Sequence, residues 1–349
     1  MNKKLVVTGV ALASLGLLAG CGTTGAGTGG GDAGTGGGGG GGEAGAYVTV
    51  VKATGIGWFD RMEVGVDEWA AETGLDARQE GPSAATNEGQ VEIIQNLIAQ
   101  KPTAITVVPN DVAGIASTLQ DARDAGIIVV THEAAGVEGA DIDIEAFENG
   151  AYGRQIMDNL AECMGEEGGY VQMVGRLTNG SHSEWVAGAL ANQEENYPEM
   201  TRLEDPIESE ENEEVAYNKA KEILAKYPDI KGFQGSAGTD VVGIARAVEE
   251  AGKTDEVCVM GTSIPSVASS YVETGAIDKI FFWDPALAGK AQLAIAKILA
   301  EGGTIEEGAD LGIEGYESLV KLDVEGADNV FAGDAALAVD TSNIAEYDF

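Results

Sequence analysis

Basic residues and histidines are scarce in this chain of 349 residues. Lys and Arg number 20 against 58 Asp and Glu, which gives a formal net charge of −38 at pH 7, and there are 2 His. A polyanion of this strength is repelled by phosphate backbones and by anionic lipid headgroups, so nucleic acid is excluded as a partner. The acids are spread along the whole chain, which is typical of a solvated, halophile-type surface in a saline or alkaline habitat.

Cysteine is equally scarce, with only Cys21, Cys163 and Cys258. The sequence has no CxxC or HExxH pattern and no motif that pairs a nucleophile with a base, which argues against a metal centre and against an enzyme. The loop at Gly55 and Gly57 lacks the spacing of a nucleotide-binding loop, so no cofactor is expected. We expect Cys163 and Cys258 to be two buried free thiols, although an exported compartment would permit a disulfide.

Long apolar runs are absent apart from one near the N-terminus. A basic start, a short apolar segment and small residues before Cys21 predict a secretory signal peptide over residues 1–20. The run is too short and too rich in glycine for a comfortable membrane span. "LLAGC" resembles the lipobox of bacterial lipoproteins, which implies lipidation at Cys21 and an attachment to the membrane through that lipid alone. Plain secretion and a retained anchor are the alternatives. Between Cys21 and Ala46 no apolar side chain is larger than alanine, which predicts a flexible tether over residues 21–46.

Strand-like and helix-like patterns alternate along the rest of the chain. The strand candidates are 47–51, 104–108, 127–131, 169–175, 232–236, 257–261 and 280–284. The clearest helical patterns between them are 87–100, 113–126, 213–227 and 240–252. Such alternation predicts parallel sheets with helices on both faces. The alternation of strands and helices occurs once before residues 136–150 and again after them. This repetition predicts two α/β domains with a ligand cleft at the carboxyl ends of their strands.

Polar and aromatic residues follow the predicted strand ends. The candidate ligand-binding residues are Lys52, Trp58, Phe59, His132, Glu133, Ser181, His182, Ser236, Gly238, Asp240, Trp283 and Asp284. Hydrogen-bonding groups, a few carboxylates and flat rings together suit a polyhydroxylated ligand such as a sugar. Trp58 and Phe59 have interdomain packing as their alternative role, and Asp240 could cap the helix at 240–252. His132 and His182 could face one another across the cleft, but we expect no metal there.

Several motifs together point to a known family. "KATGIGWF", "QEGPSAATNEGQVEIIQNLIAQ", "AITVVPND", "GTSIPSVASSYVETGAIDKIFFWDP" and the terminal "NIAEYDF" resemble the type I periplasmic sugar-binding proteins of ABC importers, nearest to the rhamnose and autoinducer-2 receptors. The resemblance implies two Rossmann-like domains joined by a three-crossing hinge, with the ligand in the cleft between them. It places residues 47–147 and 283–311 in the first domain, and 148–282 and 312–349 in the second.

The resemblance also implies a function. It predicts an extracytoplasmic, monomeric solute-binding protein that closes over a small polyol and delivers it to an ABC permease and its ATPase. The autoinducer-2 receptors of this branch bind with a Lys, two Asp, a Gln, a Pro and an Ala, of which this chain matches the Lys as Lys52. Glu133, the pair Ser181 and His182, and the region of Ser236 and Gly238 occupy the other positions. A rhamnose-like monosaccharide is therefore the favoured ligand, and an autoinducer-2 receptor or a chemosensory sugar receptor is the alternative.

Overall fold

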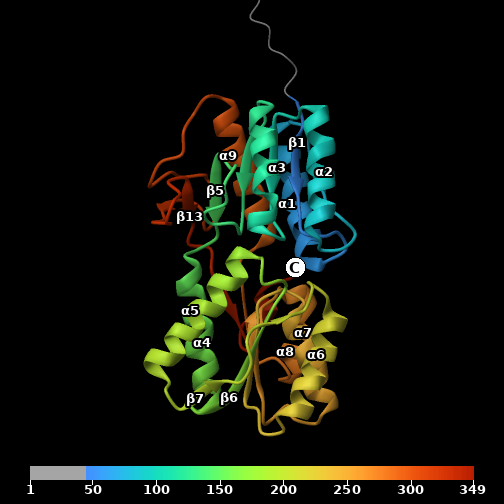
Figure 1. Cartoon of the computed structure of the whole chain (residues 1–349), viewed down its shortest axis with the longest axis vertical. Helices are drawn as coiled ribbons and strands as arrows, with labels where there is room; N and C mark the ends of the chain where they lie inside the picture. Colours follow the sequence, from blue (N-terminus) through green and yellow to red (C-terminus); the bar gives the residue numbers. More distant parts are fainter. Residues whose placement is uncertain (1–44) are drawn as a thin grey trace, which may run out of the picture. The chain divides into compact units, whose positions relative to one another are not determined.

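The computed structural model of the protein describes residues 45–349 (Figure 1). The signal peptide predicted over 1–20, the lipidation site predicted at Cys21 and the tether as far as residue 44 lie outside the described residues. Between residues 45 and 349, no helix combines the length and the apolar character that crossing a membrane requires.

Strands and helices alternate through the described residues. The strands are β1 (Tyr47–Val50), β2 (Ala77–Glu80), β3 (Ala104–Val107), β4 (Ile128–Thr131), β5 (Ile142–Glu145), β6 (Gly168–Val174), β7 (Met200–Arg202), β8 (Ile207–Glu208), β9 (Gly232–Gly235), β10 (Cys258–Thr262), β11 (Lys279–Phe282), β12 (Val320–Lys321), β13 (Val330–Ala332) and β14 (Leu337–Val339). The helices are α1 (Gly57–Thr73), α2 (Asn87–Gln100), α3 (Val112–Asp124), α4 (Asn149–Met164), α5 (Gly180–Asn196), α6 (Glu213–Lys226), α7 (Asp240–Glu250), α8 (Pro265–Thr274), α9 (Pro285–Ala300) and the 3-10 turn η1 (Ile344–Glu346).

The first sheet has seven strands in the order β12-β13-β5-β4-β3-β1-β2. Its neighbouring strands are parallel except for β12 against β13. Because successive side chains of a strand point to opposite faces, Val48 and Val50 pack with α2 and α3, whereas Tyr47 packs with Trp69 of α1 on the other face. We call this sheet, with α1, α2, α3 and α9, the N-lobe.

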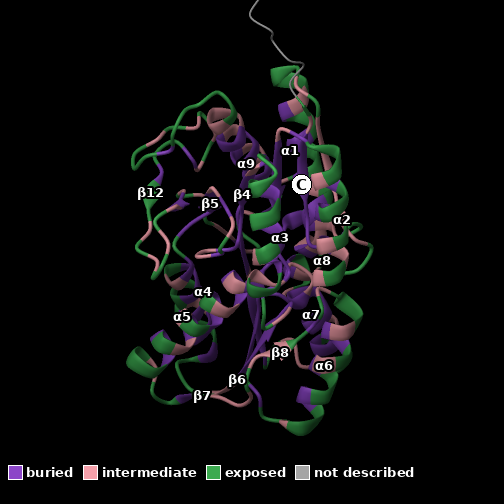
Figure 2. Cartoon of the chain, turned by 45° about the horizontal axis from the view of Figure 1, so that its top comes forward, coloured by how far each residue is buried: buried purple, intermediate pink, exposed green. Residues whose placement is uncertain are grey.

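The second sheet also has seven strands. Six follow the order β14-β11-β10-β9-β6-β7, and β8 pairs with β6. Its pairs are parallel except for β14 against β11. Helices α4 to α8 pack on this sheet and on one another, and we call the whole unit the C-lobe. The central strands of both sheets are buried, whereas the short edge strand β12 and the outer helix faces are exposed (Figure 2).

The chain passes between the lobes three times. The crossings are residues 146–148 after β5, residues 283–284 after β11 and residues 333–336 after β13. Two mostly parallel sheets, each covered by helices and joined in this way, confirm the predicted fold class.

The C-terminal segment differs from the expectation. The family resemblance implies that all of 312–349 belongs to the second domain, but β12 and β13 belong to the first sheet and only β14 joins the second. The cause is β5, which lies inside the stretch read as a link because its sequence "IDIE" alternates acids with Ile rather than forming an apolar run. β13 pairs with β5 in parallel, with Val330 opposite Asp143, so the chain returns to the N-lobe before its last crossing.

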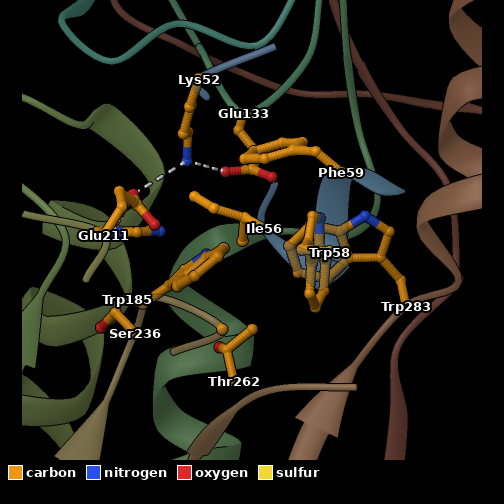
Figure 3. A pocket seen from close by; sticks show the side chains of 12 residues that line it. Lys52, Ile56, Trp58, Phe59, Glu133, Trp185, Glu211, Ser236, Thr262 and Trp283 are labelled. Atoms are coloured by element: carbon orange, nitrogen blue, oxygen red, sulfur yellow. Dashed lines mark hydrogen bonds and ion pairs between the residues drawn. The ribbon is translucent and has the colours of Figure 1, made fainter. Parts of the chain in front are cut away.

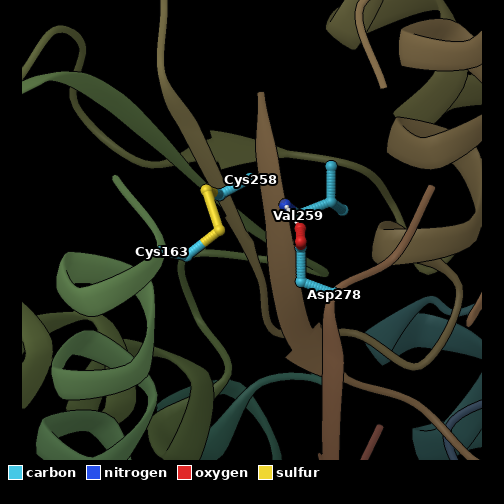
Figure 4. Close-up of a disulfide and its surroundings, with 4 residues drawn as sticks. All are labelled: Cys163, Cys258, Val259 and Asp278. Carbon is cyan, nitrogen blue, oxygen red and sulfur yellow. Dashed lines mark hydrogen bonds between the residues drawn. A yellow bond between two sulfur atoms is a disulfide. The ribbon is translucent and has the colours of Figure 1, made fainter. Parts of the chain in front are cut away.

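The cysteines also differ from the expectation. Cys163 and Cys258 form a disulfide with a Cα–Cα distance of 6.1 Å (Figure 4). α4 packs against β9 and β10, which brings the end of this helix to the start of β10, 95 residues away in the sequence. The prediction of two free thiols was wrong. The sequence around each cysteine contains no pattern that indicates packing of α4 against β10.

The disulfide generates the first prediction. A covalent link across a separation of 95 residues restricts the unfolded chain, and its loss is expected to lower the free energy of unfolding by roughly 3–5 kcal/mol. Denaturant titration of the double variant Cys163→Ala, Cys258→Ala should show this loss. Reducing agent should lower the stability of the unsubstituted protein by a similar amount and leave the double variant unchanged. Equal midpoints for the oxidised protein and the variant would contradict the predicted role of the bond.

Candidate functional site

A small cavity lies between the lobes where β1, β4, β9, β10 and β11 end (Figure 3). Its aromatic lining is Trp58, Phe59, Trp185 and Trp283; its ionisable lining is Lys52, Glu133, His182 and Glu211; and the rest is Ile56, Ser236, Gly238 and Thr262. The free volume is about 20 Å³, which is roughly the space of one water molecule. We call this space the inner chamber. Side chains from both lobes therefore fill most of the site in this closed arrangement.

Two aromatic residues of the inner chamber come from the start of α1. Trp58 and Phe59, expected to follow the end of a strand, lie in the first turn of α1, which begins at Gly57. Trp58 is 6% exposed and its ring centroid lies 4.6 Å from that of Trp283, edge to face. A Cβ atom at Gly238 of the C-lobe would lie 3.4 Å from the ring of Trp58. Trp58 therefore contacts a crossing and the opposite lobe at once.

A buried ion pair forms the polar centre of the inner chamber. Lys52 lies two residues after the end of β1 and is 2% exposed. Its Nζ lies 2.6 Å from Glu133 Oε2 and 3.8 Å from Glu211 Oε1 (Figure 3). Burial alone would lower the pKa of Lys52, but the charges of Glu133 and Glu211 outweigh burial and raise it. The ammonium group therefore stays protonated, with one acid from each lobe beside it.

Both acids have an uncommon backbone conformation. Glu133 has φ 57° and Glu211 has φ 56°, and Glu210 beside it has φ 58°. The left-handed region is unfavourable for residues other than glycine, and such strain persists where the surrounding structure holds it, often at binding sites. Two glutamates from opposite lobes therefore have strained backbones and carboxylates that approach the same ammonium group.

The two histidines have separate roles. His182 lines the inner chamber and accepts a hydrogen bond at Nδ1 from the backbone N–H of Gly175 at 3.1 Å. His132 lies behind the chamber, where its Nε2 accepts from Trp283 Nε1 at 3.2 Å and its Nδ1 donates to the carbonyl of Ile144 at 2.5 Å. Burial lowers the pKa of both, and the charge of Lys52 lowers that of His182 further. Both imidazoles are therefore neutral, and His132 orients Trp283.

Two polar groups of the inner chamber lack a protein partner. Trp58 Nε1 and Ser236 Oγ are buried and form no hydrogen bond with any residue between 45 and 349. Buried polar groups are normally hydrogen-bonded, so each exception needs an explanation. One group comes from each lobe, and both are available to a bound molecule.

Four predicted site residues lie outside the lining. His132 supports Trp283 as described. Ser181 is buried in the first turn of α5. Asp240 does not cap α7, whose N-cap is Thr239; its carboxylate instead accepts from the backbone N–H groups of Ser236 and Ala237 and orders the loop after β9.

The fourth is Asp284. It forms a two-point ion pair with Arg61 at 2.9 and 2.6 Å and caps α9 by accepting from the N–H of Ala286. Its carboxylate is thereby engaged in a contact between α1 and the crossing at residues 283–284. Asp284 thus positions the crossing, and its neighbour Trp283 lines the inner chamber.

The structure adds four residues that sequence analysis missed. Ile56, Trp185, Glu211 and Thr262 line the inner chamber. Trp185 and Thr262 lie in motifs that follow predicted strands, so their position after a strand end was the available signal. Glu211 lies in an acidic stretch that resembles an exposed surface segment, and no local pattern separates it from its neighbours.

Contacts outside the inner chamber also join the lobes. Arg176 Nε donates to the carbonyl of Ala85 at 2.8 Å, and Thr178 Oγ1 donates to the carbonyl of Asn110 at 3.2 Å. The N–H of Val112 donates to the carbonyl of Thr178 at 3.3 Å. The loop after β6 thus joins the C-lobe to the starts of α2 and α3.

Comparison with known proteins identifies the class of this cleft. The family model of the periplasmic binding protein domain matches residues 47–304, and the chain belongs to this family. It is 24% identical over 279 residues to the D-allose-binding periplasmic protein of Escherichia coli (strain K12), which covers 75% of this chain and 86% of that protein.

Solved structures support the same fold. LsrB from Clostridium saccharobutylicum in complex with AI-2 aligns with a TM-score of 0.80 and 21% identity over 87% of this chain and 100% of that chain. An ABC transporter solute-binding protein from Clostridium phytofermentas with bound L-rhamnose aligns with a TM-score of 0.80 and 19% identity over 87% of this chain and 98% of that chain. The predicted family and fold are confirmed, and the family is one of binding proteins rather than enzymes.

Two further acids lie near the polar centre, on β5. Asp143 and Glu145 are each 1% exposed and, two residues apart on a strand, point to the same face. Asp143 Oδ1 accepts from Thr131 Oγ1 at 2.6 Å, and Glu145 Oε1 accepts from the N–H of Ala135 at 3.0 Å. Burial raises the pKa of Asp143 to about 7, and burial together with the charge of Asp143 raises the pKa of Glu145. Folding therefore favours the protonated forms.

These acids predict a pH dependence of stability. The folded state binds protons more tightly than the unfolded state between the usual Asp pKa near 4 and the raised pKa of Asp143 at about 7. Stability from this group is therefore complete below pH 4 and is lost as the pH rises through 7. The variant Asp143→Asn keeps an oxygen that accepts the hydrogen bond from Thr131. It also removes the free-energy cost of ionising a buried carboxyl group at this position.

Thermal melts from pH 4 to 8 test this prediction. At pH 8 the Asp143→Asn variant should be the more stable protein by up to about 4 kcal/mol, and its melting temperature should vary less with pH. Asp121→Asn on the exposed surface of α3 is the matched control and should follow the unsubstituted protein. A parallel pH profile for Asp143→Asn would show that Asp143 does not titrate in this range.

Proposed function

We propose that the protein is an extracytoplasmic solute-binding lipoprotein of an ABC importer, which captures a rhamnose-like monosaccharide by closure of its two lobes. The main support is the inner chamber, where aromatic rings surround polar groups from both lobes that have no hydrogen-bond partner among residues 45–349. The apolar face of a sugar ring packs on aromatic planes while its hydroxyl groups need donors and acceptors around the rim. Trp58 Nε1, Ser236 Oγ and the carboxylates beside Lys52 supply both kinds of group.

The size of the inner chamber supports binding coupled to closure. A free volume of about 20 Å³ is far below the 300–1,000 Å³ or so of ordinary ligand pockets. A sugar ring therefore enters when the lobes separate, and the ring of Trp58 makes room for it. A ligand that contacts both lobes stabilises the arrangement in which those contacts exist together.

The charges around Lys52 indicate which net charge the ligand should have. The ammonium group already has Glu133 at 2.6 Å, and Glu211 adds a second acid, so the polar centre has no spare positive charge. A neutral sugar fits this balance better than an anionic sugar does. The relatives and neighbours that bind D-allose, L-rhamnose and AI-2 supply the first candidates, and binding of AI-2 alone would favour the alternative receptor function.

A ligand screen followed by two matched variants tests the proposal. Thermal shifts with L-rhamnose, D-allose, other monosaccharides and AI-2 should reveal a stabilising ligand, because a ligand that binds the folded state raises its stability by mass action. Calorimetric titration of Trp58→Phe should then show affinity lowered by about tenfold or more, because the variant loses the indole N–H and part of the ring.

Trp69→Phe is the control for that experiment. Trp69 lies on the same helix and is buried at 4% exposure against Tyr47, outside the lining of the inner chamber. It should lower the melting temperature about as much as Trp58→Phe and leave the affinity unchanged. Equal affinities for both variants would show that Trp58 only packs the lobes together.

The proposed lipid anchor has its own test. The motif "LLAGC" supports lipidation at Cys21, so Cys21→Ser should move the protein from the membrane fraction to the medium. Thr24→Ser, three residues further on, should leave the fractionation unchanged. A Cys21→Ser protein that still sediments with membranes would exclude this anchor and leave the proposed binding function standing.

A further inference from the structure

A second and larger space opens beside the inner chamber, and we call it the outer cleft. It has a volume of about 490 Å³ and shares Ile56 and Glu211 with the inner chamber. Its N-lobe wall is formed by residues 53–57 and 83–86, and its C-lobe wall includes residues 210–213. The outer cleft lies within the size range of ordinary ligand pockets, whereas the inner chamber does not.

Close approach of the two lobes defines the outer cleft. Its N-lobe wall contains Gly55, Gly57, Ser83 and Ala84, whose small side chains leave the space open. A Cβ atom on Gly57 would come within 2.8 Å of Val267 Cγ2 in the C-lobe. The hydrogen bond between Arg176 and Ala85, at 2.8 Å, joins the same two walls. The cleft is therefore a defined space of the closed arrangement, and its shape depends on small residues.

Glu211 lies at the junction of the two spaces. Its side chain is 7% exposed, and its nearest cations or imidazoles are Lys52 Nζ at 3.8 Å and His182 Nδ1 at 3.9 Å. Both distances exceed that of a hydrogen bond, and Nδ1 of His182 already accepts from Gly175. Burial raises the pKa of Glu211. A buried carboxyl group placed like this can bind hydroxyl groups of a molecule that occupies either space.

Other groups of the outer cleft match the same chemistry. Thr239 Oγ1 is buried and has no partner within residues 45–349, and Thr239 lines the C-lobe wall. Glu210 and Glu213 add carboxylates to that wall, against the guanidinium of Arg176. Carboxylates and hydroxyl groups bind the hydroxyls of a neutral sugar, whereas an excess of acids repels phosphorylated sugars and uronic acids.

We propose that the cleft has two connected subsites, with a terminal sugar ring in the inner chamber and a second sugar unit in the outer cleft. The ligand class is then a neutral disaccharide or glycoside, whose linkage passes between Ile56 and Glu211. This inference rests on the proposed function and extends it, because a free monosaccharide would fill the inner chamber and leave the outer cleft to water.

Paired sugars test the two subsites in the full-length protein. L-rhamnose is compared with rutinose, which carries rhamnose as its terminal ring, D-glucose with cellobiose, and D-galactose with lactose. The affinity of each sugar is measured by calorimetric titration. For at least one pair, the disaccharide should bind about tenfold more tightly than the monosaccharide, because its second unit adds contacts in the outer cleft.

A blocking variant then locates the second unit. Ala84→Trp places a large ring in the outer cleft from the exposed loop before α2 and should remove the advantage of the disaccharide without changing monosaccharide affinity. Ser83→Trp on the same loop provides a second variant. Ala71→Trp, on the exposed face of α1, is the matched control and should leave both affinities unchanged.

Each outcome distinguishes the two ideas. Monosaccharides that bind as tightly as every disaccharide would overturn the two-subsite proposal and leave the proposed function intact. A disaccharide advantage that persists in Ala84→Trp and Ser83→Trp would place the second unit elsewhere and would also overturn it. Absence of binding by every sugar, together with a normal melt, would remove the proposed function and this inference with it.

Discussion

The buried ammonium group of Lys52 is the constraint on which the cleft depends. Removing a charge from water costs several kcal/mol unless close partners compensate it, and Lys52 is 2% exposed. Glu133 provides the first partner within the N-lobe, at 2.6 Å. Glu211 approaches from the C-lobe and adds a second acid. Acids from both lobes therefore set the charge balance of the site together.

The two tryptophans Trp58 and Trp283 of the inner chamber differ in whether their indole N–H groups are already hydrogen-bonded. The indole N–H of Trp283 is engaged by His132, which is in turn bound to the backbone of β5 at Ile144. The imidazole of His132 thereby joins the crossing at residues 283–284 to β5, the strand that leads into the first crossing. The indole N–H of Trp58 has no such partner among the described residues. We infer that Trp283 forms a rigid back wall and that Trp58 is the ring that responds to a ligand.

Asp and Glu residues have different roles in this protein depending on whether they are exposed or buried. The chain carries 58 Asp and Glu, and most of those that the structure describes are exposed to solvent, where they interact weakly and are screened by salt. Asp143 and Glu145 are almost fully buried, and there burial makes the charged form of each carboxyl group unfavourable. An acidic composition thus accounts for the surface and says little about the cleft.

Much of the architecture and part of the site followed from the sequence alone. Alternating strand and helix patterns predict parallel sheets. Because ligands bind at the carboxyl ends of such strands, the sequence also predicted that Lys52, Trp58, Glu133 and Trp283 lie together. These signals are local, because each depends on a periodic run and the residues that follow it. The tertiary structure alone decided that Glu211 enters the inner chamber, since its acidic stretch resembles exposed surface in the sequence. It also decided the disulfide between Cys163 and Cys258 and the pairing of β13 with β5. Both contacts join segments far apart in the sequence, and no local sequence pattern predicts which distant segment will be the partner.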